Sequence, residues 1–184
     1  MVLVITCCAI PLGAIYTDIA KKEHITKQIA QHLKNENIRI EDDTARMISQ
    51  IVYEESIQHG LDYRLVLALM KIESNFKHNA VSPMGARGLL QVKPSVAKFI
   101  AQDAGIQWDG HRTLDKPDSN IKIGVFFFSQ LLKDFKNTNL ALKAYNMGPT
   151  RVKQLALNKT QASRGFSGLV MNEYRKNATT FPDP

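Results

Sequence analysis

Hydrophobic residues recur at spacings of three and four along most of the chain, which is the pattern of amphipathic α-helices. Stretches rich in Asn, Ser, Gly and Pro separate these segments. The pattern predicts six to eight helices with little or no β-sheet, and therefore a mainly α fold. The predicted helices are residues 18–35, 44–59, 63–74, 94–103, 118–135, 139–147, 150–158 and 168–177.

The segment 18–35 has the narrowest apolar face among these helices. Ile25, Ile29 and Leu33 form a single stripe among Lys, Gln and His residues, so we expect a largely solvated helix. The polar stretch 36–43 follows it. We therefore expect the main domain to begin beyond this break.

The segment 63–74 is apolar nearly all round, which predicts a helix buried in the core. In the segment 118–135, Gly124 lies on the same inward face as Ile121 and Val125. A glycine among inward residues predicts that another segment packs closely there.

Residues 2–16 form a largely apolar run without a charged side chain. The run is shorter than the roughly 20 residues of a membrane span and suits a secretory signal, with cleavage near Gly13 and Ala14. No Lys or Arg precedes it, so a buried segment of the domain or a misassigned start codon is the alternative. We expect an exported chain with three parts: residues 1–16, a signal peptide or hydrophobic segment; 17–43, a helical extension; and 44–184, the main domain.

The 184 residues include 24 basic and 17 acidic side chains, for a net charge of +7. Seven basic and two acidic residues follow Leu140, so +5 of this charge lies in the C-terminal quarter. Such a field favours a polyanion, with nucleic acid, anionic lipid and carboxylate-rich cell wall as candidates. The only cysteines are the adjacent Cys7 and Cys8, which excludes a disulfide framework or a cysteine-based zinc site in the remaining chain.

Most signatures of cofactor-dependent or nucleophilic enzymes are absent. The five histidines form no HExxH pair, and the chain contains neither a P-loop nor GxGxxG. Residues 165–168 do not have the strand–turn–helix setting of a serine hydrolase elbow. We therefore expect no metal and no cofactor.

Glu73 is the strongest candidate for chemistry. At helical spacing its neighbours are Val66, Leu69 and Met70, which places the carboxyl group on a stripe that faces the core. Desolvation raises the pKa of a carboxyl group, and a protonated carboxyl near neutral pH can act as a general acid. A capping or ion-paired glutamate at the helix end is the structural alternative.

Three motifs surround this residue in order. Glu73-Ser74 is followed by Ser82 and by Gly85-Ala86-Arg87-Gly88-Leu89-Leu90-Gln91, and about fifty residues later comes Ala144-Tyr145-Asn146-Met147-Gly148-Pro149. This arrangement resembles the soluble lytic transglycosylase domain, a relative of goose-type lysozyme, with its Glu-Ser, Gly-Leu-Met-Gln and Ala-Tyr-Asn motifs. The resemblance implies a lysozyme-like helical domain.

The resemblance extends over residues 45–178. Leu90 stands where the family usually has Met, a mild apolar change. Asn120 and Gly124 resemble an Asn and a Gly on the family's helix between the second and third motifs.

The resemblance also implies roles for individual residues. Gln91 would contact an N-acetyl sugar, Tyr145 and Asn146 would line the substrate site, and Tyr174 would hydrogen-bond the catalytic Glu73. A loop-bracing Gln91, a core Tyr145 and a packing role for Tyr174 are the alternatives. The substrate-binding residues implied by the resemblance are Ser74, Ser82, Gly88, Leu90, Gln91, Tyr145, Asn146 and Tyr174.

By this resemblance the chain would cleave the MurNAc–GlcNAc β-1,4 bond of peptidoglycan in the bacterial periplasm or cell envelope. Glu73 would act as acid and then as base, and a 1,6-anhydro sugar would form without water. No acidic residue lies between Ser74 and Gln91 or in the motif 144–149, which agrees with a single catalytic carboxyl group.

Other functions remain open at this point. A muramidase could use Asp103, Asp109, Asp115 or Asp118 as a second carboxylate, and a non-catalytic peptidoglycan-binding module could share the fold. We expect peptidoglycan glycan strands as the partner of a monomer, with an envelope-spanning secretion or conjugation assembly as a further candidate. Nucleic acid is not expected, because no recognition motif accompanies the positive charge.

Overall fold

The structure is a computed structural model, and it describes residues 12–36, 40–157 and 165–184. Within these ranges it contains eight α-helices, one 3₁₀ helix (η1) and no strand; two isolated bridges join Arg87 to Val81 and to Val92. The prediction of a mainly helical fold is confirmed. The elements are α1 (Leu12–Glu36), α2 (Asp42–His59), α3 (Tyr63–Ser74), α4 (Pro94–Ile100), η1 (His111–Asp115), α5 (Pro117–Phe135), α6 (Thr138–Met147), α7 (Pro149–Leu157) and α8 (Gly165–Thr180).

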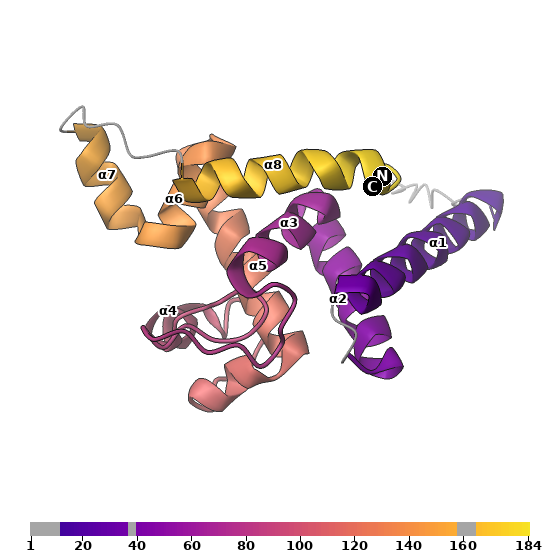
Figure 1. Cartoon of the computed structure of the whole chain (residues 1–184), viewed down its shortest axis with the longest axis horizontal. Coiled ribbons are helices and arrows are strands. Elements are labelled where there is room, and N and C mark those ends of the chain that lie inside the picture. Colours follow the sequence, from indigo (N-terminus) through magenta and orange to yellow (C-terminus); the bar gives the residue numbers. More distant parts are fainter. Residues whose placement is uncertain (1–11, 37–39, 158–164) are drawn as a thin grey trace, which may run out of the picture.

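Helix α3 lies at the centre of the core, as its apolar sequence predicts (Figure 1). Residues Tyr63–Met70 are all buried, and α2 and α8 both pack against this helix. Asp62 caps its N-terminus by accepting a hydrogen bond from the backbone N–H of Arg64, and the helix ends at Asn75 in the left-handed conformation. Glu73 is therefore held at the edge of the core, in the last turn of an enclosed helix.

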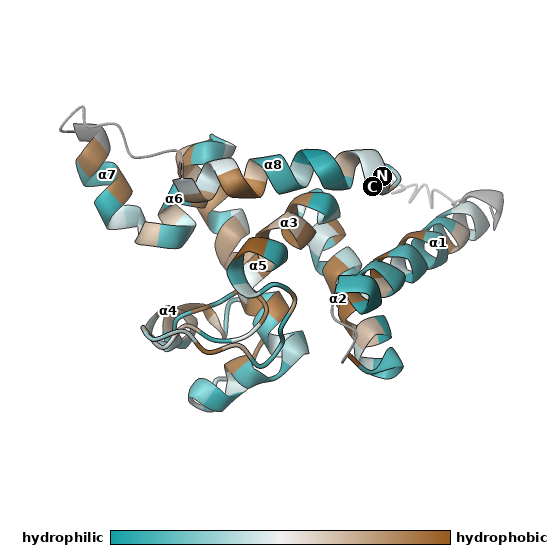
Figure 2. Ribbon diagram, in the orientation of Figure 1, coloured by the Kyte–Doolittle hydropathy of each residue, from teal (hydrophilic) through white to brown (hydrophobic). Residues whose placement is uncertain are grey.

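Most side chains of α1 among residues 16–36 are exposed or half-buried, as its narrow apolar stripe predicts, whereas the stripe itself is buried. Ile25, Ile29 and Leu33 are 0% exposed and belong to the same hydrophobic core as the inward residues of α2. A narrow stripe suffices because α2 packs along it, and full burial of each such side chain contributes about 1.5–3 kcal/mol. Figure 2 shows hydrophobic residues alternating with hydrophilic ones along α1, as expected when one face is covered.

The predicted N-terminal hydrophobic segment lies partly outside the described residues, which begin at residue 12. Residues 12–16 belong to α1, so the predicted boundary after residue 16 falls inside a helix. Across the described ranges, no helix has both the length and the hydropathy needed to cross a bilayer.

The close packing predicted at Gly124 of α5 is confirmed. A Cβ atom at this position would lie 2.6 Å from Cδ1 and 2.8 Å from Cβ of Leu90, so Leu90 would have to move. The backbone of α5 therefore lies directly against the loop that joins α3 to α4 (residues 75–93, called the α3–α4 loop).

Candidate active site

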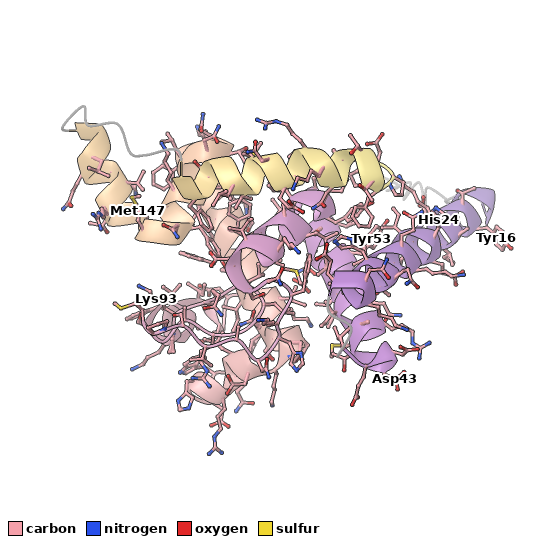
Figure 3. The ribbon with its side chains drawn as sticks, viewed as in Figure 1. Tyr16, His24, Asp43, Tyr53, Lys93 and Met147 are labelled. Carbon is pink, nitrogen blue, oxygen red and sulfur yellow. The ribbon has the colours of Figure 1, made fainter. Side chains whose placement is uncertain are left out.

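A cavity of about 250 Å³, called the Glu73 cleft, lies where the C-terminal ends of α3 and α6 meet the α3–α4 loop. Two of its lining residues, Lys93 just before α4 and Met147 at the end of α6, are labelled in Figure 3. Among the lining residues in the described part of the chain, only Glu73 is acidic. The residues that line the cleft are Glu73, Ser82, Ala86, Gln91, Val92, Lys93, Val96, Phe127, Tyr145, Asn146, Met147, Gly148 and Pro149.

The carboxyl group of Glu73 has the environment of a general acid. Its helical neighbours Val66, Leu69 and Met70 are buried, and burial raises the pKa of Glu73 to about 7. The carboxyl group makes no hydrogen bond or ion pair with the described residues, so no cation or donor opposes the effect of desolvation on its pKa. Glu73 can therefore hold a proton near neutral pH and release it into the cleft.

Tyr145 combines the two roles that its sequence left open. Its ring packs against those of Phe127 and Phe128, with centroid separations of 5.4 and 5.9 Å, and it also lines the Glu73 cleft. The hydroxyl group donates a 2.7 Å hydrogen bond to the carbonyl oxygen of Leu90. Burial and the neighbouring Glu73 both raise the pKa of Tyr145, so this hydroxyl keeps its proton.

Asn120 fixes the α3–α4 loop from the first turns of α5. Its side chain is 0% exposed, and Oδ1 accepts a 2.9 Å hydrogen bond from the backbone N–H of Leu90. Its Nδ2 donates to the carbonyl oxygens of Arg87 (2.8 Å) and Leu114 (3.1 Å). One buried amide therefore satisfies two backbone groups of the α3–α4 loop and one of η1, which aligns the motif residues along the cleft.

Gln91, Ser82 and Asn146 line the cleft, as the sequence predicts for substrate-binding residues. Gln91 has a positive φ of 45°, and its Nε2 donates to the carbonyl oxygens of Ala80 (3.1 Å) and Gly88 (2.9 Å). This residue therefore braces its own loop while it lines the cleft. Asn146 is exposed at the rim.

Three other predicted residues shape the cleft without lining it. The Ser74 hydroxyl points back along α3 and donates to the carbonyl oxygen of Met70 at 3.1 Å. Leu90 is fully buried, and Gly88 packs against Asn120. Ser74, Gly88 and Leu90 therefore affect the cleft through the backbone around it.

Tyr174 is not a partner of Glu73, which corrects the expectation drawn from the resemblance. Its hydroxyl donates a 2.9 Å hydrogen bond to Oδ2 of Asp62, which caps the opposite end of α3. Asp62 also pairs with Arg64. Tyr174 therefore joins α8 to the start of α3 and does not reach the cleft.

The structure adds four lining residues that lie outside the three sequence motifs: Val92, Lys93, Val96 and Phe127. Lys93 is the only basic residue among the lining residues in the described ranges. Val92, Lys93 and Val96 follow Gln91 closely, so proximity to the second motif could have indicated them. Phe127 carries no such signal, because three consecutive phenylalanines on one helix do not reveal which ring faces a cleft.

Comparison with known families agrees with this geometry. Residues 50–165 match the family described as Transglycosylase SLT domain, and this range contains every residue that lines the Glu73 cleft. The chain belongs to this family. Helix α1 and most of α8 lie outside the matched residues of this SLT-domain protein.

Two relatives of the SLT-domain protein are named as lytic murein transglycosylases. The soluble lytic murein transglycosylase of Salmonella typhimurium is 34% identical over 89 residues, which cover 47% of this chain and 14% of that protein. The membrane-bound lytic murein transglycosylase E of Buchnera aphidicola is 26% identical over 163 residues, covering 82% of this chain and 77% of the relative. The chain thus spans about one seventh of the length of its soluble relative.

Among solved structures, the fold is similar to lytic transglycosylase Slt of Pseudomonas aeruginosa. The TM-score is 0.65 at 24% identity, over 91% of this chain and 29% of that one. The 70 kDa soluble lytic transglycosylase of Escherichia coli gives a TM-score of 0.66 at 18% identity, over 86% of this chain and 30% of that one. The SLT-domain protein therefore has the helical fold of lytic transglycosylases.

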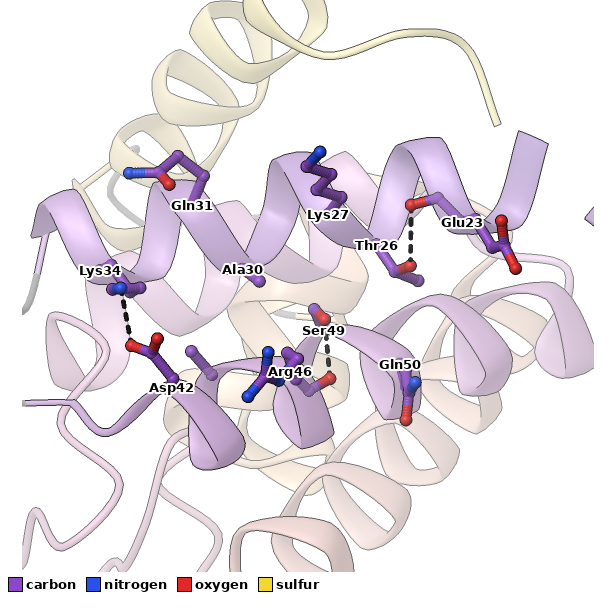
Figure 4. A pocket seen from close by; sticks show the side chains of 11 residues that line it. Glu23, Thr26, Lys27, Ala30, Gln31, Lys34, Asp42, Arg46, Ser49 and Gln50 are labelled. Atoms are coloured by element: carbon purple, nitrogen blue, oxygen red, sulfur yellow. Dashed lines mark hydrogen bonds and ion pairs between the residues drawn. The ribbon is translucent and has the colours of Figure 1, made fainter. Parts of the chain in front are cut away.

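A larger cavity of about 380 Å³ lies between α1 and α2, but its residues offer no catalytic arrangement (Figure 4). Lys34 pairs with Asp42 at 2.6 Å across its mouth, and the hydroxyls of Thr26 and Ser49 donate to backbone carbonyls of their own helices. The described residues also contain no cluster of three His, Cys, Asp or Glu side chains that could hold a metal ion. The Glu73 cleft is therefore the candidate site.

Proposed function

We propose that the SLT-domain protein is a peptidoglycan lytic transglycosylase with Glu73 as its general acid and base. The observation that carries this proposal is a single carboxyl group, with its pKa raised by burial, in a cleft formed by the family's matched residues. The names of the relatives supply the substrate, murein. In the Pseudomonas lytic transglycosylase, replacement of a glutamate by glutamine gives an inactive mutant.

The proposed reaction needs only this carboxyl group. Protonated Glu73 donates its proton to the glycosidic oxygen as the bond from MurNAc C1 to that oxygen breaks. The resulting carboxylate then accepts the proton of the MurNAc 6-hydroxyl group, whose oxygen forms a new bond to C1. The product is a 1,6-anhydro sugar, the proton returns to Glu73, and no water is consumed.

The position of the other acidic residues favours this reaction over hydrolysis. Hydrolytic glycosidases hold two carboxyl groups roughly 5–9.5 Å apart across the scissile bond. None of Asp103, Asp109, Asp115 and Asp118 lines the Glu73 cleft. Asp115 pairs with Arg87, and Asp109 lines a separate cavity beside η1.

Product mass tests the proposal directly. Purified peptidoglycan is digested with the protein, and the soluble muropeptides are weighed by mass spectrometry. We expect products lighter by one water than reducing-end muropeptides. Reducing-end products would identify a muramidase instead, and retention on peptidoglycan without any release would identify a binding module.

The rate should fall as the pH rises through about 7, since the first step needs protonated Glu73. At pH 6 a carboxyl group with a pKa of about 7 is about 90% protonated, whereas one at the ordinary value of 4.5 is about 3% protonated. We expect kcat/KM to be nearly constant from pH 5 to 6 and to drop about tenfold per unit above pH 7.5. Circular dichroism at each pH serves as the control for folding, and a rate that rises through pH 7 would contradict the assignment.

The same proposal places the protein in the bacterial cell envelope, where its glycan-strand substrate lies. We include three further points in this proposal: the protein is exported, it is a monomer, and it associates with a secretion or conjugation assembly. One relative is the transglycosylase of the bacteriophage PRD1, 30% identical over 116 residues, 63% of this chain and 38% of that protein. A fractionation experiment that finds the protein outside the envelope would remove this part of the proposal.

A further inference from the structure

The turn that follows Glu73 is contacted by His32 of α1, and His32 in turn contacts a residue near the C-terminus. The ring of His32 on α1 lies edge-on to that of Phe76, with centroids 5.5 Å apart and an interplanar angle of 88°. The same imidazole lies edge-on to Phe181, beyond the end of α8, at 5.1 Å and 83°. Neither His32 nor Phe181 falls within the residues matched by the SLT family.

The backbone of this turn is strained. Asn75 and Phe76 have φ values of 50° and 59°, and two successive non-glycine residues in the left-handed region are uncommon. Such a conformation persists only where the surroundings determine it. The Phe76 side chain is 1% exposed, so its packing can hold the turn in this conformation.

Helix α1 also contacts α3 on the other side of Glu73 in the sequence. Glu36 forms an ion pair with Lys71, whose Nζ lies 5.7 Å from the centroid of the Phe76 ring. Residues of α1 thus contact both Lys71, two positions before Glu73, and Phe76, three positions after it.

The position of the Glu73 carboxyl group depends on this backbone. The carboxyl group has no hydrogen-bond partner among the described residues. Packing and the path of the last turn of α3 therefore fix its place in the cleft. We propose that His32 is a positioning residue, which holds Phe76 and thereby the turn that aims Glu73 into the cleft. This inference rests on the proposed function and assigns a role in catalysis to α1.

An uncharged imidazole suits this place. Burial lowers the pKa of His32, and the nearby Lys71 lowers it further, while Glu36 and Glu173 oppose the shift. At neutral pH the ring is therefore neutral. It can present its edge to two phenylalanine rings without the cost of a buried charge.

Substitution of His32 with a matched control tests the inference. His32→Ala removes the contact with Phe76, whereas Ile29→Val or Ile29→Ala shortens a fully buried side chain of the same helix. Whichever Ile29 variant melts closest to His32→Ala serves as the control. We expect His32→Ala to lower kcat at least tenfold with KM changed less than twofold, the Ile29 variant to keep kcat within twofold, and His32→Phe to restore kcat to within threefold.

A second readout does not depend on activity. The carboxyl carbon of Glu73 is titrated by ¹³C NMR, with Glu73→Gln providing the assignment. We expect its pKa to fall toward the ordinary value in His32→Ala and to stay in place in the Ile29 control. If His32→Ala does not fold, His32→Leu, which fills the space without an aromatic edge, replaces it.

The two readouts separate failure of this inference from failure of the proposed function. Equal kcat and equal Glu73 titration in the His32 and Ile29 variants would overturn the positioning role. A wild-type protein that releases no muropeptide would overturn the proposed function. The titration alone would then decide whether His32 positions Glu73.

Discussion

Replacing Glu73 with glutamine should lower the release of anhydromuropeptides by about 10²–10⁴-fold, the range that a general acid–base group contributes. The amide has nearly the same size as the carboxyl group but cannot donate a proton to the glycosidic oxygen. Release of soluble muropeptides per unit time, quantified by chromatography and mass spectrometry, measures the effect. Because no second carboxyl group lines the cleft among the residues that the structure describes, we expect no residual pathway through a neighbouring side chain.

A matched control is Glu54→Gln on α2. The Glu54 side chain is 52% exposed and pairs with Lys22 on the surface, so its loss should leave activity unchanged. Activity of Glu73→Gln within tenfold of the wild type would show that this carboxyl group is not the acid.

The same Glu73→Gln substitution should stabilise the protein at alkaline pH. The unfolded chain releases the Glu73 proton near pH 4.5, whereas the folded chain keeps it to about pH 7, so the stability that this proton gives is lost as pH rises between these values. The difference corresponds to about 3 kcal/mol at pH 8 and vanishes below pH 4.5. Thermal unfolding of both proteins at pH 4 and pH 8 measures it, and an equal difference in melting temperature at the two pH values would contradict the raised pKa.

Gly88→Ala should destabilise the fold by about 3 kcal/mol or more, and should disable the cleft. Gly88 has a φ of 74°, and a Cβ atom there would lie 2.3 Å from Nδ2 of Asn120 and 2.8 Å from the carbonyl oxygen of Leu114. The Asn120 side chain cannot move aside without breaking its hydrogen bonds to the backbone, each worth roughly 1 kcal/mol. The strain of an alanine backbone in the left-handed conformation adds about 1–2 kcal/mol to this loss of stability.

Gly85→Ala is the control for this prediction. Gly85 lies in the same loop with a φ of 77°, but a Cβ atom there would meet nothing within 4 Å. The Gly85→Ala variant should therefore lose only the stability that corresponds to left-handed backbone strain, about 1–2 kcal/mol. We expect the melting temperature of Gly88→Ala to be roughly 6–12 °C below that of the wild type and clearly below that of Gly85→Ala. Equal melting temperatures would show that Asn120 does not brace the loop as described.

The sequence by itself determined most helices of this protein and singled out Glu73, the only acidic side chain among the described residues that line the cleft. Helix α3 begins and ends where its apolar pattern predicts, because periodicity and capping residues act within a few residues of one another. The place of Glu73 at the end of a helix that is apolar nearly all round already implied a desolvated carboxyl group, and the pKa raised by burial agrees. Gly124 also followed from its position on an inward helical face.

Tertiary structure decided the features that depend on which helix packs against which. A narrow stripe on α1 became fully buried because α2 covers it, and the width of a stripe does not reveal its partner. Tyr174 hydrogen-bonds Asp62 and not Glu73, because the register of α8 on α3 places it at the other end of that helix. The contact of His32 with Phe76 joins residues 44 positions apart, and nothing in the local sequence of either residue specifies it. Local periodicity encodes which face of a helix is buried, whereas the neighbour of each side chain is chosen by the packing of the whole chain.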